Sequence, residues 1–144
     1  MNIVVAGKVF VSSLLDGSTL PRCGVIQAET LTELDADDTV LIVGEGAMLP
    51  ERISVMAAVV NADSGFDSSK LSGTAVITCG MGSRNTVSVT SRTAEYITVA
   101  LNRSVHTLRG LCEPLELPLP VRIGVDEYSY MAAFAASLLL GNIE

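Results

Sequence analysis

Runs of consecutive apolar residues, each closed by a turn, mark the first half of the chain. The clearest runs are residues 2–6, 39–43 and 74–78, and the first two are followed at once by Gly7 and Gly44. Unbroken apolar runs of this length are typical of strands that are covered on both faces, as in a parallel sheet. The pattern therefore predicts a strand at residues 2–6 and buried strands at residues 39–43 and 74–78.

Residues 50–62 fit two structures. Pro50 could begin a helix, because proline is tolerated in the first turn. However, the β-branched pair Val59 and Val60 lies just before the turn sequence Asn-Ala-Asp-Ser-Gly, which favours a strand that ends there. We expect a strand from about residue 54 to residue 61.

Two earlier segments have weaker patterns. Residues 8–15 continue the apolar, β-branched character of the first strand and predict a second strand, followed by turn chemistry at residues 16–18. Residues 30–38 are acidic and suit either one short helix or a solvated loop.

The pattern changes after residue 85, where apolar and polar residues alternate. Residues 86–90 and 97–101 alternate strictly, and residues 105–108 suit a third short strand. Alternation predicts antiparallel strands with one face in water. Residues 113–121 carry three prolines between leucines, so we expect an extended segment at a sheet edge.

An apolar helix is expected at the end, from about Tyr128 to Leu140. Asp126 is a suitable N-cap, and Gly141 is a natural stop. The helix has almost no polar face, which predicts burial on more than one side. Together these elements predict one α/β domain over residues 1–144, with a mixed sheet of buried parallel-type strands followed by alternating antiparallel strands.

Composition narrows the class of protein. The chain has 144 residues, of which 49% are hydrophobic and 17% charged, and this excludes intrinsic disorder. Its longest apolar runs are far shorter than the roughly 20 residues of a membrane span. The N-terminus lacks the basic region of a signal peptide, so we expect a cytoplasmic protein.

The net charge and the cysteines give further information about binding partners and about the state of the thiols. The net charge of −7 disfavours nucleic-acid binding, which needs basic side chains for the phosphates. The chain has an odd number of cysteines, and no two of them form a CxxC motif, so we expect free thiols at Cys23, Cys79 and Cys112. A chain with so few charges is expected to leave an apolar patch uncovered, which predicts a homo-oligomer or a protein partner.

Two glycine-containing loops at strand ends are candidate ligand-binding segments, because α/β proteins bind ligands at the carboxyl ends of their strands. For the first loop a plain tight turn is the favoured explanation, and for the second it is a structural loop with a buried free thiol. The first loop is not a dinucleotide fingerprint, because Leu49 stands where GxGxxG needs a third glycine. A separate segment, Gly7-Lys8, lacks the first glycine and the Ser or Thr of a phosphate loop. The candidate residues are Gly44, Glu45, Gly46, Cys79, Gly80, Gly82, Ser83, Arg84 and Asn85.

No catalytic residue, metal site or cofactor is predicted. A reactive Cys79 would need a base or cation nearby, and nothing in the sequence places the single histidine, His106, beside it. One histidine and scattered cysteines do not supply four zinc ligands. The acidic residues 35–38 lack the glycine and terminal glutamate of a calcium loop.

The order of signals over residues 55–144 resembles the central domain of Mur ligases, ATP-dependent enzymes that add amino acids to peptidoglycan precursors. The segment Val-Val-Asn-Ala-Asp at 59–63 is similar to that family's strand ending, and Ala-Val-Ile-Thr-Cys-Gly at 75–80 to its next strand. Alternating strands, the Leu-Pro segment at 117–120, the paired alanines at 132–136 and the closing Leu-Gly follow in the family's order.

Departures from the family concern its chemistry. The phosphate loop, the magnesium-binding residues and the carboxyl-terminal domain have no counterpart, and Val125-Asp126 and Ser129 replace the family's His-Asn and Asn. The resemblance therefore implies a non-catalytic module that acts through protein partners or as a homo-oligomer, with a link to cell-wall metabolism. The alternative is a small-molecule or nucleotide-binding domain that uses the two glycine loops.

Overall fold

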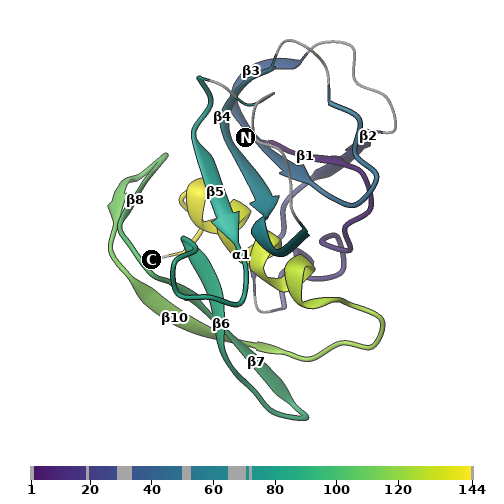
Figure 1. Cartoon of the computed structure of the whole chain (residues 1–144), viewed down its shortest axis with the longest axis vertical. Helices are drawn as coiled ribbons and strands as arrows, with labels where there is room; N and C mark the ends of the chain where they lie inside the picture. Colours follow the sequence, from purple (N-terminus) through teal and green to yellow (C-terminus); the bar gives the residue numbers. More distant parts are fainter. Residues whose placement is uncertain are drawn as a thin grey trace.

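The computed structural model describes residues 2–18, 20–28, 34–49, 53–64, 71 and 73–143. Ten strands, one helix and one short 3-10 turn form within these ranges (Figure 1). The elements are β1 (Asn2–Ala6), β2 (Val25–Ala28), β3 (Leu34–Val43), β4 (Ile53–Asn61), η1 (Ala62–Ser64), β5 (Val76–Cys79), β6 (Val87–Arg92), β7 (Tyr96–Leu101), β8 (Val105–Thr107), β9 (Gly110–Cys112), β10 (Leu115–Pro120) and α1 (Glu127–Leu139).

Eight strands form one mixed sheet in the order β10-β7-β6-β5-β4-β3-β1-β2. The strands from β2 to β6 pair in parallel, whereas β6, β7 and β10 pair antiparallel. The two remaining strands, β8 and β9, form a separate antiparallel hairpin. The predicted mixed sheet, with buried parallel strands first and alternating antiparallel strands afterwards, is confirmed.

One face of the sheet is covered by α1, which contacts the strands from β3 to β7 (Figure 1). Every residue of α1 except Glu127 is buried, so the expected burial of this helix is confirmed. Tyr130 and Phe134 are among the largest fully buried side chains. Burying a side chain of this size contributes about 1.5–3 kcal/mol, so α1 supplies much of the core.

The connection from β1 to β2 covers the rest of this face. Val11, Leu14 and Leu20 are buried in the same cluster as α1. A second apolar cluster lies on the opposite face, because successive side chains of a strand point to opposite sides. Its buried members are Val4, Ala6, Leu41, Val43, Ala58, Val60 and Leu71.

The expected strand over residues 8–15 is wrong. Leu14 and Leu15 donate backbone hydrogen bonds to the carbonyl of Val11, which makes a turn, and only Lys8 forms an isolated bridge, to Glu45. The apolar residues serve the core as a packed loop. The next strand is β2, which the sequence pattern does not reveal.

The acidic segment 30–38 is also neither helix nor loop where it is described. Residues 34–38 belong to β3, and Leu34 pairs with Ile53 of β4. Residues 30–33 lie outside the described residues. Pairing with β4 overrides the loop-like composition, because strand formation depends strongly on tertiary context.

The strand expected over residues 54–61 is confirmed as β4, and the proline-rich edge segment is confirmed as β10. Val121 donates its backbone N–H to Glu95, next to β7. Alternation then directs the missing N–H positions of Pro118 and Pro120 away from β7, so neither proline removes a hydrogen bond from the sheet.

The stop of α1 at Gly141 agrees with the sequence prediction, whereas the N-cap at Asp126 differs from it in its hydrogen bonds. Asp126 is the N-cap, but its carboxylate accepts no helix N–H and instead accepts a hydrogen bond from the Ser129 hydroxyl. The stop at Gly141 is confirmed, with a φ of +78°. Asn142 donates to Ser137 and Gly141 donates to Leu138, which together make a Schellman motif. No helix in the described ranges has the length and hydropathy needed to cross a bilayer.

Candidate functional site: a crevice at the carboxyl ends of β1, β3 and β4

The strand order reverses between β1 and β3. The chain leaves β1 towards β2, on the face that carries α1, and leaves β3 in the other direction, towards β4. Ala47 and Leu49, which follow β3, pack against the cluster on the opposite face. Connections that diverge to opposite faces define a topological switch point, and open α/β sheets bind ligands outside the strand ends there.

The two loops that leave the switch point touch through their backbones. Lys8 donates its N–H to the Glu45 carbonyl over 2.9 Å, and Gly44 donates to the Ala6 carbonyl over 2.7 Å. A Cβ atom at Gly7 would lie 2.7 Å from the Gly44 carbonyl oxygen, and Gly7 also has a φ of +85°. Glycine is therefore required at this contact.

A cavity of 360 Å³ opens beside this contact. Its size lies within the range of small-molecule sites, about 300–1,000 Å³. Lys8 comes from the end of β1, Gly44 and Glu45 from the end of β3, and the amino end of α1 closes the other side. The lining residues are Lys8, Val43, Gly44, Glu45, Asn61, Ser64, Asp126 and Tyr128. We call this cavity the crevice.

Tyr128 forms the floor of the crevice and holds two strands. Its hydroxyl lies 2.7 Å from the carbonyl oxygen of Val43 and 3.0 Å from that of Val59, so one O–H is shared between the ends of β3 and β4. Burial raises the pKa of this hydroxyl well above its ordinary value, and nearby Cys79 and Asp126 raise it further. Tyr128 therefore stays protonated as a donor.

The polar groups around the crevice have both signs of charge. Lys8 is exposed, with its ammonium 5.7 Å from the centre of the Phe10 ring, and the carboxylates of Glu45 and Asp126 line the same cavity. The Ser129 hydroxyl accepts the Phe10 N–H over 2.9 Å and donates to Asp126, which fixes the rim to α1. Such a set of groups suits hydrogen bonding to a polar molecule that is neutral or carries both charges.

The second predicted loop, residues 79–85, lies next to the crevice but does not line it. Asp63, after β4, accepts the Met81 N–H over 2.9 Å, which ties this loop to the end of β4. Asn85 donates to the Gly82 carbonyl within the loop. Ser83 and Arg84 are exposed. These contacts account for the conformation of the loop without a ligand.

Cys79 is fully buried in the core beneath α1. Burial raises the pKa of its thiol far above the ordinary value, and His106 is exposed on the separate β8–β9 hairpin. A thiol without a base, a cation or access to solvent is not an activated nucleophile.

Of the predicted residues, only Gly44 and Glu45 line the crevice, while Gly46 is exposed beyond it. The pattern does not identify Lys8, Asn61 or Tyr128. For the first two a signal exists in the sequence, because each lies at the end of an apolar run and strand ends converge in a parallel sheet. Tyr128 becomes part of the site only through the packing of α1.

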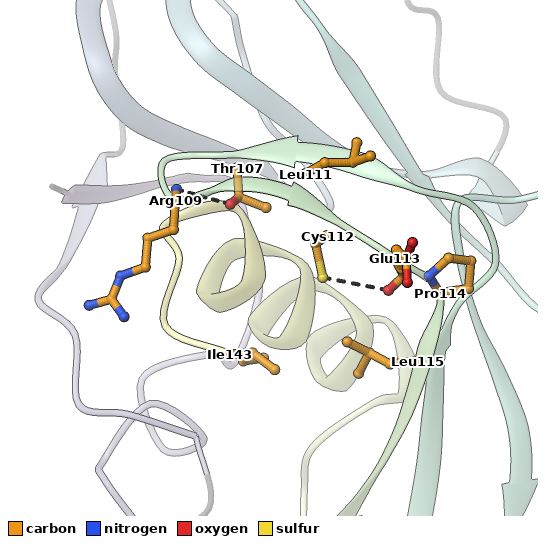
Figure 2. A pocket seen from close by; sticks show the side chains of 8 residues that line it. All are labelled: Thr107, Arg109, Leu111, Cys112, Glu113, Pro114, Leu115 and Ile143. Carbon is orange, nitrogen blue, oxygen red and sulfur yellow. Dashed lines mark hydrogen bonds between the residues drawn. The ribbon is translucent and has the colours of Figure 1, made fainter.

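A second hollow, of 690 Å³, lies between the β8–β9 hairpin and the residues that follow α1 (Figure 2). The residues that line it include the apolar Leu115 and Ile143 and the charged Arg109 and Glu113. We call it the hairpin groove. No predicted site residue contributes to it.

Within the described ranges, no three His, Cys, Asp or Glu side chains gather as a metal site would require. Comparison of the chain with protein families, with curated proteins and with solved structures finds no match.

Proposed function

We propose that the chain is a small-molecule-binding domain and that its ligand occupies the crevice. The observation that carries this proposal is the position of the cavity: it lies at the carboxyl ends of the strands where the sheet reverses its order. This is the alternative function expected from the glycine loop at Gly44, with Lys8 and Tyr128 added to the site.

The lining indicates the class of ligand. Glu45 and Asp126 would repel a compact polyanion, and the single cation Lys8 cannot neutralise several phosphate charges. Asn61, Ser64 and the two carboxylates offer donors and acceptors for hydroxyl and amino groups. We propose a neutral or zwitterionic polar ligand, such as a nucleoside, a sugar or an amino acid.

A thermal-shift screen tests this proposal, because a ligand that binds only the native state raises the melting temperature. The screen compares nucleosides, free sugars and amino acids with nucleoside triphosphates and UDP-sugars. A ligand at 100 times its Kd stabilises the native state by about 2.7 kcal/mol. The proposal predicts a shift with at least one neutral or zwitterionic compound, and no shift in any class would contradict it.

A pair of variants locates the binding site. Ser64→Trp places a large side chain in the crevice and is expected to abolish the shift. Ala62→Trp is the matched control, because Ala62 belongs to the same exposed turn but does not line the crevice. If both variants bind equally well, the ligand lies elsewhere.

A second proposal is that the chain is a non-catalytic Mur-ligase-like module that acts through a protein partner or by self-association, with a role linked to cell-wall metabolism. The resemblance of residues 55–144 to the central domain of Mur ligases supports it. So does the exposure of Leu108, Leu111 and Ile123, of which the last is fully exposed. Size-exclusion chromatography with light scattering tests self-association, and a pull-down tests binding to a Mur-type ligase. A strictly monomeric chain that binds no such ligase would contradict it.

A further inference from the structure

Three charged side chains line the crevice, and none of them has an ion-pair partner among the described residues. Lys8 carries a positive charge, whereas Glu45 and Asp126 carry negative charges. The ammonium of Lys8 lies 5.7 Å from the centre of the Phe10 ring and contacts this ring rather than a carboxylate. The crevice is therefore left with a net negative charge and two carboxylates that no described cation neutralises.

Glu45 lies beside Lys8 without forming an ion pair with it. The two residues make an isolated antiparallel bridge, in which the Lys8 N–H donates to the Glu45 carbonyl over 2.9 Å. Side chains at paired positions of an antiparallel bridge leave the backbone on the same side, with Cβ atoms about 4.5–5.5 Å apart. The Glu45 side chain is exposed and accepts no hydrogen bond from a described residue. Its carboxylate is therefore available to a ligand in the crevice.

Asp126 brings the second carboxylate to the crevice from the amino end of α1. Its Oδ1 accepts the Ser129 hydroxyl, and neither of its oxygens caps the helix. Its Oδ2 has no partner among the described residues. Burial, then Cys79 and then the charge of Asp126 raise the pKa of Tyr128 at the floor of the crevice, so the charge of Asp126 acts on the interior of the cavity.

An ammonium group on the ligand complements these two carboxylates. It is positively charged and donates three hydrogen bonds, and charge-assisted hydrogen bonds are about twice as strong as neutral ones. Both carboxylates border one cavity of 360 Å³, near the lower limit of small-molecule sites, so a single small ligand meets both. A calcium ion fits less well, because it takes about 6–8 oxygen ligands and no three acidic side chains gather in the described ranges.

We propose that the ligand of the crevice carries an amino group, and that Glu45 and Asp126 together bind its ammonium form. Among the polar ligands that suit the crevice, this selects compounds with a free ammonium group, such as an amino sugar or an amino acid. Lys8 is available for a carboxylate, which only the amino acid has. The ammonium site rests on the proposed function of the crevice and narrows the class of its ligand.

Matched pairs of compounds test the need for the ammonium group. Isothermal titration calorimetry near neutral pH compares glucosamine with glucose, and L-alanine with L-lactate, in which a hydroxyl replaces the amino group. We expect the amine of at least one pair to bind on the order of tenfold more tightly than its hydroxyl counterpart, because a charge-assisted hydrogen bond replaces a neutral one. N-Acetylglucosamine keeps the nitrogen without its charge and is expected to bind no more tightly than glucose.

Two neutral variants locate the ammonium group. Glu45→Gln and Asp126→Asn each remove one negative charge and keep the shape of the side chain, and asparagine also suits an N-cap. We expect each to weaken binding of the amine on the order of tenfold, because a hydrogen bond to a charged group is lost. Glu95→Gln is the matched control, since Glu95 is exposed and does not line the crevice. Far-UV circular dichroism checks that each variant is folded.

Lys8→Gln distinguishes the two kinds of amine. Removing this positive charge is expected to strengthen glucosamine binding about threefold, because a like charge is lost. The same substitution is expected to weaken alanine binding on the order of tenfold, because the carboxylate of alanine loses its cation. Either response supports the ammonium site and identifies the kind of amine that binds there.

The ammonium site and the binding function of the crevice fail in different ways. Hydroxyl compounds that bind as tightly as the amines would overturn the ammonium site alone, and the crevice would remain a site for other polar ligands. Amine binding that is unchanged in both Glu45→Gln and Asp126→Asn would also overturn it, because the ammonium group would then lie elsewhere. A chain that binds none of the compounds, in calorimetry or in the thermal-shift screen, would overturn both proposals.

Discussion

The hydroxyl of Tyr128 donates to the carbonyl oxygen of Val43 across a distance of 2.7 Å, although 85 positions separate the two residues along the chain. Tyr128 lies in the first turn of α1, and Val43 is the last residue of β3. The bond therefore fixes the amino end of the helix against the strand end that opens the crevice. The same hydroxyl lies 3.0 Å from the Val59 carbonyl, so β4 is held at the same point.

We expect Tyr128→Phe to destabilise the protein by about 1–3 kcal/mol, because the substitution removes the donor from two buried hydrogen bonds to backbone carbonyl groups. Urea denaturation followed by circular dichroism measures the change. Tyr96→Phe is the control, since Tyr96 is 48% exposed and removal of its hydroxyl leaves no buried group without a partner. Equal effects of the two substitutions would show that the Tyr128 hydroxyl does not hold the strand ends.

Substitution of each of the two buried serines of α1 by alanine is expected to change the stability in opposite ways. Ser129 accepts the Phe10 N–H and donates to Asp126, whereas the hydroxyl of Ser137 is fully buried and has no hydrogen-bond partner among the described residues. We expect Ser129→Ala to lower the free energy of unfolding by about 1–3 kcal/mol. Ser137→Ala is expected to leave it unchanged or raise it, because alanine removes an unsatisfied polar group and suits a helix. Chemical denaturation of both variants decides this, and a similar loss in both would contradict the assignment.

A buried strand could be predicted where burial on both faces produces an unbroken run of apolar residues, as at residues 40–43 of β3. Short edge strands produce no such run. β2 spans only Val25–Ala28 and includes the polar Gln27, whose side-chain amide donates to the Gly7 carbonyl. The acidic start of β3 was not predicted as a strand for a related reason. Its strand conformation comes from pairing with β4, and the composition of the segment contains no sign of that pairing.

The candidate site could be predicted only as far as strand ends identify it. Gly44 and Glu45 follow an apolar run directly, so local pattern finds them. Tyr128 reaches the crevice through the position of a helix more than 80 residues away, and no local pattern encodes that distance. For Cys79 the explanation that the sequence favours, a structural loop with a buried free thiol, agrees with the burial of its side chain in the core at the end of β5.

Asp16 is expected to titrate well below an ordinary aspartate. The Ser18 side chain and backbone both donate to its carboxylate, and Arg122 adds an ion pair at 3.0 Å, which lowers the pKa from 3.8 to about 2. A group whose pKa is lowered by folding stabilises the native state above its unfolded pKa, so this contribution is lost as the pH falls from 3.8 through about 2.

Carboxyl-carbon NMR measures the pKa of Asp16 in wild type and in Ser18→Ala. The substitution removes the largest cause of the shift, so the midpoint is expected to rise towards 3.8. Ser13→Ala, at an exposed position in the same connection, is the control and is expected to leave the midpoint in place. A midpoint that does not move in Ser18→Ala would show that this hydroxyl does not bind the carboxylate in solution.

Alkaline stability provides a test of the burial of Cys79. Folding raises the pKa of its thiol above the ordinary value of 9.0, because burial penalises the thiolate. A group whose pKa is raised by folding binds its proton more tightly in the native state. Its contribution is therefore complete below pH 9 and is lost as the pH rises above that value.

Above pH 9 we expect the ionisation of Cys79 in the unfolded chain to lower the free energy of unfolding by about 1.4 kcal/mol for each pH unit. Cys79→Ala removes this loss and gives a flatter curve, although its smaller side chain lowers stability at neutral pH. Urea denaturation of both proteins from pH 7 to pH 10.5 measures the two slopes. Parallel curves would show that the thiol ionises in the native state. In that case Cys79 would be accessible to solvent, and the loop at residues 79–85 would return as a candidate binding segment beside the crevice.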